Sequence, residues 1–251
     1  MLTDFTFELH SPEDKASIML DTAFESLKKF DWGSDLSALN PIEDAAIAAH
    51  QSPEAGKDLE RRLIAALGGS LSIDAQEYVC RKLAMVGTAA SVPSLAPLLL
   101  KKEISHMARF ALERIPAVEA GQALREALPK VTGLVKIGVI SSLGGRREAA
   151  AVTELSQLLK DSDAAVARAA ALALGAIGTT DAASVLQLAL KGSGIPQAVT
   201  DGILSCAEAL LAVNKTAEAS AIYKSFEQAS HPRIVRLAAA RGLLACASKQ
   251  G

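Results

Sequence analysis

Residues 158–178 of this chain read LLKDSDAAVARAAALALGAIG and decide its fold. A short polar stretch precedes a run of Ala, Leu and Val, and Gly178 follows that run. Val166 lies eight residues before Leu174, a spacing that places both side chains on one face of a helix. A segment with this spacing, bounded by polar residues and a glycine, predicts one helix that ends near Gly178.

The same spacing recurs along the chain, so we predict a fold built from repeats. Strong copies run from Val135 to Leu143 and from Val235 to Leu243, and weaker copies run from Ala75 to Leu83 and from Ile104 to Leu112. A second series of apolar residues follows, at Leu95, Leu124, Leu155, Leu188 and Ile222. Turn residues separate the two series. Each unit, about 29 to 34 residues long, is therefore predicted to be a helix, a tight turn and a second helix.

The composition agrees with a stack of helices. The chain holds 48 Ala and 34 Leu among 251 residues, but aromatic residues make up only 4%. Strands favour β-branched and aromatic residues, so this composition argues against an all-β fold. Small side chains let the axes of neighbouring helices approach closely, while Leu, Ile and Val fill the seam between them. We therefore predict an all-α fold built from stacked helix pairs.

The decisive stretch resembles HEAT repeats, in particular the short bacterial repeats related to phycobilisome lyases, and residues 231–239 are similar to its opening. The resemblance covers residues 71–251. It implies a HEAT-like solenoid, which is a right-handed α-α superhelix, with about five helix pairs and a C-terminal helix. Residues 215–224 depart from it, because they look more like half of a tetratricopeptide repeat. Residues 78–83 and 105–116 also resemble HEAT-repeat proteins of planctomycete-type bacteria, a resemblance that implies no activity.

Residues 1–70 fit the repeat less well and are predicted to form an acidic helical cap. Pro12, Pro41 and Pro53 each follow a polar residue and indicate helix starts, whereas Gly33 indicates a helix end. Residues 1–10 alternate apolar and polar side chains. An extended tail is favoured there over a strand, because a lone strand would have no partner.

The net charge of −2 gives the chain no general basic field. Residues 1–60 carry four Lys and 13 acidic residues, a net charge of −9, whereas residues 61–251 carry 22 basic and 15 acidic residues, a net charge of +7. The basic pairs are scattered over helices and turns, with no aromatic residues interleaved. Weak nucleic-acid binding is therefore only a second alternative for the function.

No group of residues predicts catalysis. The four histidines are followed by Ser, Gln, Met and Pro, so the His-Glu dipeptides that bind iron in the HEAT-repeat hydroxylases are absent. Cys80, Cys206 and Cys246 lie in Ala- and Leu-rich segments without a nearby His, so we interpret them as buried structural thiols. No phosphate-binding glycine loop occurs. We expect no enzyme, no metal and no cofactor.

Six residues are candidates for contact with a partner. Arg146 and Arg147 stand where the next repeat has Ile177 and Gly178, so a charged pair replaces an apolar turn. With Glu148, this pair is expected either to form an ion pair with the neighbouring repeat or to hold an acidic segment of a partner. The other candidates are on the second helices of their units, on the predicted concave face: Glu154, Gln187 and Lys224.

These features favour a non-catalytic scaffold that binds a protein or peptide. The first alternative, which the resemblance implies, is a bilin or tetrapyrrole lyase or chaperone of the phycobilisome type, and the scarcity of aromatic residues argues against it. The longest clean apolar stretch, residues 169–178, is shorter than the ~20 residues of a membrane-spanning helix. The first ten residues do not look like a secretory signal. The cytoplasm is favoured, with export behind a removed signal left open.

Overall fold

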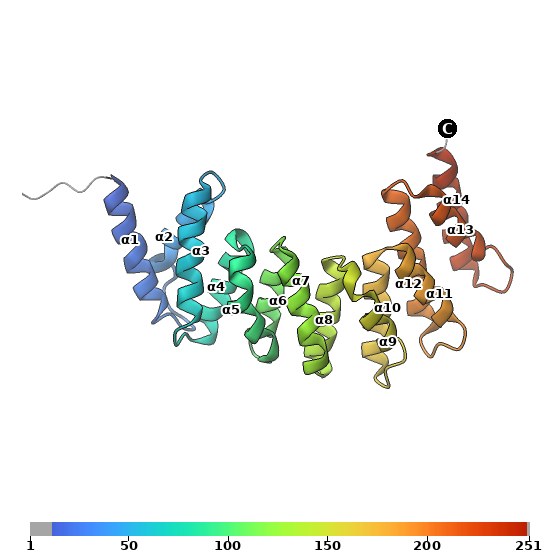
Figure 1. The fold of residues 1–251 in the computed structure, drawn as a ribbon, viewed down its shortest axis with the longest axis horizontal. Coiled ribbons are helices and arrows are strands. Elements are labelled where there is room, and N and C mark those ends of the chain that lie inside the picture. The colour runs from blue at the N-terminus through green and yellow to red at the C-terminus, as the bar shows by residue number, and fades with distance from the viewer. Residues whose placement is uncertain (1–11, 250–251) are drawn as a thin grey trace, which may run out of the picture. The chain divides into compact units, whose positions relative to one another are not determined.

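The computed structural model describes residues 12–249 of the chain. Every regular element in that range is a helix, which confirms the predicted all-α class. The chain divides into two compact units, Met1–Ala117 and Val118–Gly251, and Figure 1 shows that each is a succession of helices joined by short turns. The extended tail expected at residues 1–10 lies outside the described residues.

Short connections join the helices of each unit. The first unit contains α1 (Pro12–Leu27), η1 (Leu36–Leu39), α2 (Asn40–Ala48), α3 (Pro53–Leu67), α4 (Ile73–Val86), η2 (Ala89–Ser91), α5 (Val92–Leu95), η3 (Ala96–Leu100) and α6 (Ser105–Arg114). The second contains α7 (Val118–Ala127), η4 (Leu128–Lys130), α8 (Gly133–Gly145), η5 (Ala149–Ala151), α9 (Val152–Leu158), α10 (Ala164–Ile177), α11 (Thr180–Leu190), α12 (Pro196–Ala212), α13 (Thr216–Ser225) and α14 (Arg233–Ser248).

The second unit is a stack of helix pairs. Its first helices, α8, α10, α12 and α14, pack against one another in that order, and we call them the A helices. The helices α9, α11 and α13 follow α8, α10 and α12 as the second members of the pairs. Together with α7, which precedes α8, we call them the B helices. The predicted alternation of helix, tight turn and helix is thus confirmed.

Polar residues start the helices where the sequence places them. The side chain of Ser52 accepts a hydrogen bond from the N–H of Ala55, and that of Asp163 accepts one from the N–H of Ala165 at 2.8 Å. Each satisfies a backbone donor that the first turn of a helix leaves without an internal partner. At the other end of α10, Gly178 has a φ of 68°, the left-handed conformation that glycine adopts at little cost.

The predicted anchor residues form most of the core. In the first series, Leu83, Leu112, Leu143 and Leu174 are all fully buried. The last member, Leu243 of α14, is only half-buried, and Val235, Ala239 and Cys246 supply the buried face of that helix instead. In the second series, Leu95, Leu124 and Leu155 are fully buried and Ile222 is 6% exposed.

Leu188 was the wrong choice of anchor for α11. Its side chain is 80% exposed, and Leu186 is fully buried in its place. Leu186 follows Leu155 by 31 residues, so it keeps the step that separates Leu124 from Leu155. Both leucines lie in the segment VLQLAL of residues 185–190, whose composition favours neither of them.

Two A helices approach each other more closely than side chains allow. A Cβ atom on Gly175 of α10 would lie 2.7 Å from the Cα atom of Gly202 on α12, and a Cβ atom on Gly202 would lie 2.6 Å from the carbonyl oxygen of Ala171. Backbone therefore packs against backbone at this crossing. Any side chain there would have to push the two helices apart.

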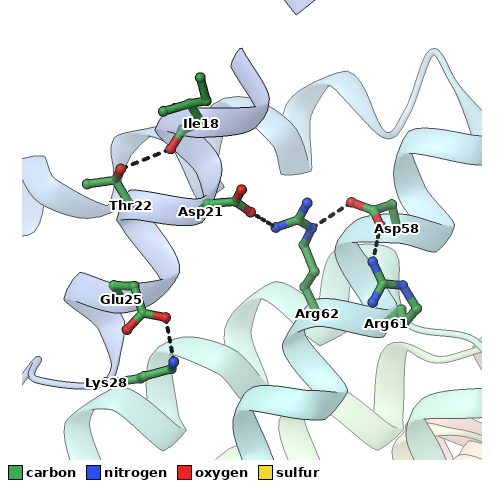
Figure 2. Close-up of polar contacts among 8 residues, drawn as sticks. All are labelled: Ile18, Asp21, Thr22, Glu25, Lys28, Asp58, Arg61 and Arg62. Atoms are coloured by element: carbon green, nitrogen blue, oxygen red, sulfur yellow. Dashed lines mark hydrogen bonds and ion pairs between the residues drawn. The ribbon is translucent and has the colours of Figure 1, made fainter. Parts of the chain in front are cut away.

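In the first unit, an ion-pair network joins α1 to α3. Figure 2 shows the guanidinium of Arg62 between Asp21 of α1 and Asp58 of α3. Its Nε donates to the Oδ2 of Asp58 at 2.7 Å, and Arg61 pairs with the same carboxylate. The hydrogen bond from Arg61 lowers the pKa of Asp58, so this contribution to stability is lost as the pH falls through that pKa. The helices predicted at Pro12, Pro41 and Pro53 are present. The boundary of the cap after residue 70 stays a prediction.

The described helices were also compared with the requirements of a membrane-spanning helix. None of the helices between residues 12 and 249 combines the length and the apolar character that crossing a bilayer requires.

Candidate functional site

An open hollow of about 340 Å³ lies on the surface of the second unit, beside the start of α9. It is lined by residues of α7, of the turn after α8 and of α9: Val118, Gln122, Arg125, Glu126, Glu148, Ala150 and Glu154. Two of the six residues predicted to contact a partner, Glu148 and Glu154, therefore meet in one place. We call it the α7/α9 hollow.

A side-chain pair across two repeats closes one side of the hollow. Arg125 of α7 donates from its Nε and Nη2 atoms to the Oε1 of Glu154 on α9, at 2.9 and 2.7 Å. Both side chains are about one-third exposed, so water weakens the attraction and the pair adds less than about 1 kcal/mol to stability. Its main effect is to fix the direction of Glu154.

Glu148 is seated against the start of α7. A Cβ atom on Gly121 would lie 1.8 Å from the Oε2 of Glu148, so the carboxylate rests on the bare backbone of the glycine. The first turn of a helix carries a partial positive charge that favours a carboxylate at this place. Gly121 thus allows the turn after α8 to approach α7.

That turn has an unusual backbone. Arg147 has a φ of 54°, the left-handed conformation that Gly178 adopts at the end of α10. The N–H of Glu148 donates to the carbonyl of Leu143 at 3.0 Å, and the N–H of Arg147 donates to the carbonyl of Gly144 at 2.9 Å. These two bonds form the Schellman motif that closes helix C-termini, in which the left-handed residue is usually glycine. The proposed alignment of Arg147 with Gly178 fits this geometry.

Replacement of Arg147 by glycine is expected to raise the free energy of unfolding by about 1 kcal/mol, because glycine adopts the left-handed conformation without steric cost. Chemical denaturation of the wild type and the variant measures the change. Asn214→Gly is the matched control, since Asn214 has a φ of 61° after α12 and asparagine tolerates that conformation better than arginine. Its gain should be smaller. Equal stabilities of wild type and Arg147→Gly would contradict the strain.

The four other predicted contact residues lie outside the hollow. Arg146 is half-buried at the end of α8, whereas Arg147 is exposed. Gln187 on α11 and Lys224 on α13 are exposed, and neither lines the hollow. The structure therefore brings Glu148 and Glu154 together but leaves the remaining candidates spread over the surface.

Sequence inspection missed the α7 side of the hollow. Arg125 lies 29 residues before Glu154, which is one repeat length, so the repeat itself signals that the two residues are neighbours. Val118 carries no such signal, and its side chain is 74% exposed. Three carboxylates face one guanidinium in the hollow, which gives it a net charge of −2 beside an apolar side chain.

The part of the chain that forms this hollow matches a known family. A family model described as HEAT repeats matches residues 121–194, which include most of α7 and all of α8 to α11. Over these residues the chain is similar to HEAT repeats. The predicted HEAT-like solenoid is confirmed by this match, whereas the likeness to phycobilisome lyases and to planctomycete-type proteins stays a prediction.

Solved structures resemble this chain at low sequence identity. An archaeal HEAT-like repeats protein from Thermococcus onnurineus NA1 is 13% identical, with 93% of this chain and 97% of that chain covered and a TM-score of 0.49. Human deoxyhypusine hydroxylase is 16% identical, with 93% and 98% covered and a TM-score of 0.41. A designed armadillo repeat protein in complex with the peptide (KR)4 is 17% identical, with 90% and 99% covered and a TM-score of 0.38. No curated protein matches the sequence significantly.

The cysteines are core residues, as the sequence predicts. Cys80 and Cys206 are fully buried and Cys246 is 3% exposed. Burial raises the pKa of the Cys80 thiol and of the Cys206 thiol to about 12, so both stay protonated and unreactive near neutral pH. Among the described residues, no three His, Cys, Asp or Glu side chains are grouped as a metal site would require.

Thiol labelling tests the burial of the cysteines directly. Ellman's reagent at pH 8 is expected to modify fewer than one thiol per folded chain within minutes, because the thiolate is the reacting form and burial excludes both charge and reagent. In denaturant, all three thiols should react. Rapid modification of one thiol in the folded protein would show that a cysteine is accessible and activated.

Proposed function

We propose that this chain is a non-catalytic scaffold that binds a protein or peptide partner through the α7/α9 hollow. The observation that supports this proposal is the juxtaposition of exposed Val118 with the carboxylates of Glu126, Glu148 and Glu154. An apolar contact beside a charged rim is how protein surfaces hold an extended segment. The proposed partner segment carries a Lys or Arg next to an apolar side chain.

The charge of the hollow changes the kind of partner expected. From the sequence, Arg146 and Arg147 favour an acidic segment. Of the four charged side chains that line the hollow, Arg125 alone is a cation. Its Nε and Nη2 atoms already donate hydrogen bonds to Glu154. A basic segment in the hollow would instead meet the carboxylate of Glu148, which lines the hollow and rests on the backbone of Gly121. An extended partner that continues along the B helices would next meet the exposed side chains of Gln187 and Lys224.

Selection from a random peptide library tests this function without knowledge of the natural partner. The purified chain is expected to enrich peptides with Lys or Arg beside an aliphatic or aromatic residue. Glu148→Lys should abolish their binding, because it reverses one of the charges that face the peptide. Glu218→Lys is the matched control, since it makes the same change in net charge at an exposed position of α13, away from the hollow.

Three outcomes of the selection would contradict the proposal. Enrichment of acidic peptides would instead support the arginine pair as the contact. Equal loss of binding in both Lys variants would show only a general charge effect. Binding that survives Val118→Asp would place the contact elsewhere on the surface. Thermal unfolding of each variant confirms that it is folded before binding is compared.

The two other functions raised by the sequence have separate readouts. A bilin lyase or chaperone would change the absorbance of a bilin on incubation with the chain. Nucleic-acid binding by the residues after position 60 would give a gel shift that weakens steeply with salt, because bound basic residues release counterions. Either result would overturn the assignment of a peptide-binding scaffold.

A further inference from the structure

The turn after α1 carries the most exposed of the large apolar side chains described in the structure. Trp32 is 90% exposed, and Leu36, four residues later, is 60% exposed. Trp32 is also the only tryptophan in the sequence. Burial of this large apolar surface against a partner would be favourable, and tryptophan is among the residues enriched at the centres of protein interfaces.

Hydrogen bonds hold this turn in one shape. The N–H of Trp32 donates to the Oδ1 of Asp31 at 2.9 Å, and the N–H of Asp31 donates to the Oγ of Ser34 at 3.0 Å. Gly33 follows with a φ of 79°, in the left-handed region. Asp35 then begins η1 and accepts from the N–H of Ser37. The main chain of this turn is thus hydrogen-bonded, and Asp31 and Asp35 flank Trp32 in the sequence, so little main-chain entropy would be lost when the indole docks.

A hollow on the second unit has the complementary character. It measures about 430 Å³ and lies between the A helices α8 and α10. Its apolar lining includes Ile137 and the half-exposed Leu172, with several alanines between them. Arg168 is its sole charged lining residue, and in the described part of the chain this guanidinium forms no ion pair. We call it the α8/α10 hollow.

The two surfaces are complementary in apolar character and in charge. The Trp32 turn offers an exposed indole with Asp31 and Asp35 beside it in the sequence. The α8/α10 hollow offers an apolar lining and, among the described residues, the unpaired guanidinium of Arg168. The same complementarity holds over longer distances, because residues 1–60 have a net charge of −9 and residues 61–251 a net charge of +7. Opposite fields of this kind steer association and orient the partners.

We propose that Trp32 of one copy of the chain inserts into the α8/α10 hollow of a second copy, with its flanking carboxylates facing Arg168. This self-association goes beyond peptide binding at the α7/α9 hollow and uses a different face, that of the A helices. Because the inserted turn and the receiving hollow are different surfaces, the contact is heterologous. Repetition of such a contact produces either a closed ring or an open chain of copies.

Tryptophan fluorescence gives a direct readout, because the full chain contains one tryptophan. As the concentration rises from low micromolar to hundreds of micromolar, the emission of Trp32 is expected to shift to the blue and its quenching by acrylamide to fall. Sedimentation velocity over the same range should show growth in mass. Both changes should weaken with added salt, because exposed charges are screened.

Variants on each side of the contact provide the control. Trp32→Ala and Leu172→Asp are each expected to weaken self-association at least about 30-fold, as removal of a central anchor or its seat does. Leu188→Asp is the matched control for Leu172→Asp, because it introduces the same charge at an exposed leucine of α11 outside the α8/α10 hollow. It should self-associate like the wild type.

Mixing the two defective variants separates this arrangement from any other. Trp32→Ala retains the hollow and Leu172→Asp retains the tryptophan, so an equimolar mixture is expected to form complexes of one copy of each and to stop there. A mixture that stays monomeric would overturn the heterologous contact. A blue-shifted emission that does not depend on concentration would place Trp32 within its own chain and would equally overturn it. A fully quenchable, unshifted emission at every concentration would show that no docking occurs.

Discussion

Replacement of Gly202 by alanine is expected to lower the free energy of unfolding by about 2 to 3 kcal/mol. The added Cβ atom would lie 2.6 Å from the carbonyl oxygen of Ala171 and 3.1 Å from the Cδ1 of Leu186. The first neighbour is backbone in α10 and cannot rotate away, so α10 and α12 must separate. Alanine gains up to about 1 kcal/mol in helix propensity over glycine, and this gain only partly offsets the clash.

The opposite result is expected at Gly56, which makes it the control for Gly202. A Cβ atom on Gly56 would meet the Cβ of Ala49 at 3.5 Å, an ordinary contact, so Gly56→Ala should stabilise the chain by about 0.5 to 1 kcal/mol. Both variants are compared by chemical denaturation followed by circular dichroism. A Gly202→Ala protein as stable as the wild type would show that α10 and α12 are not in backbone contact.

Removal of the Glu60 side chain has the second large expected effect. Glu60 is only 4% exposed, and its carboxylate accepts hydrogen bonds from the N–H of Thr88 at 2.6 Å and from the Oγ of Ser91 at 2.6 Å. It also accepts from the Oγ1 of Thr88 at 3.0 Å. One carboxylate on α3 therefore organises the turn between α4 and η2. In Glu60→Ala the fully buried hydroxyl of Ser91 loses its acceptor, and we expect a loss of about 2 to 3 kcal/mol.

The matched control for Glu60→Ala is Glu54→Ala, which removes a glutamate whose ion pair lies on the surface. Glu54 pairs with Lys57 one turn later on α3, and both side chains are largely exposed, so Glu54→Ala should change the stability by less than about 0.5 kcal/mol. Glu60→Gln, which keeps one acceptor oxygen, should fall between the two. Equal effects of Glu60→Ala and Glu54→Ala in thermal denaturation would rule out a structural role for the buried carboxylate.

The fold was predictable because its information is local and repeated. Most repeats bring their own breakers and a fully buried leucine at a fixed place, as Leu143 and Leu174 show, so several weak signals reinforce one another. The prediction was wrong where two candidates lay within one turn of helix. Leu186 and Leu188 are equally apolar, but Leu186, which keeps the 31-residue step from Leu155, is buried and Leu188 is exposed.

The candidate site was predictable only in part. Glu148 could be found because it follows the charged pair that replaces an apolar turn of the repeat. Glu154 could be found because it is a polar residue on a second helix, on the predicted concave face. Arg125 belongs to the preceding repeat and becomes relevant only when the repeats are stacked. The exposure of Val118 and Trp32 had no signal in the sequence, because an apolar residue in a helical protein is expected to be buried. An apolar residue is exposed when no neighbouring helix packs over it, and the periodicity of the sequence does not show which residues those are.

The turns between A and B helices are closed by their own main chain. After α8, the N–H of Glu148 bonds to the carbonyl of Leu143, and after α12 the N–H of Lys215 bonds to that of Leu210 in the same way. Neither bond reaches into another repeat. A block of about 31 residues, the step from Leu143 to Leu174, could therefore be duplicated or deleted as a cassette with the main-chain bonds of these two turns kept. Gene duplication or protein engineering could therefore change the number of repeats. The main requirement is that the packing faces of the helices match at each new junction.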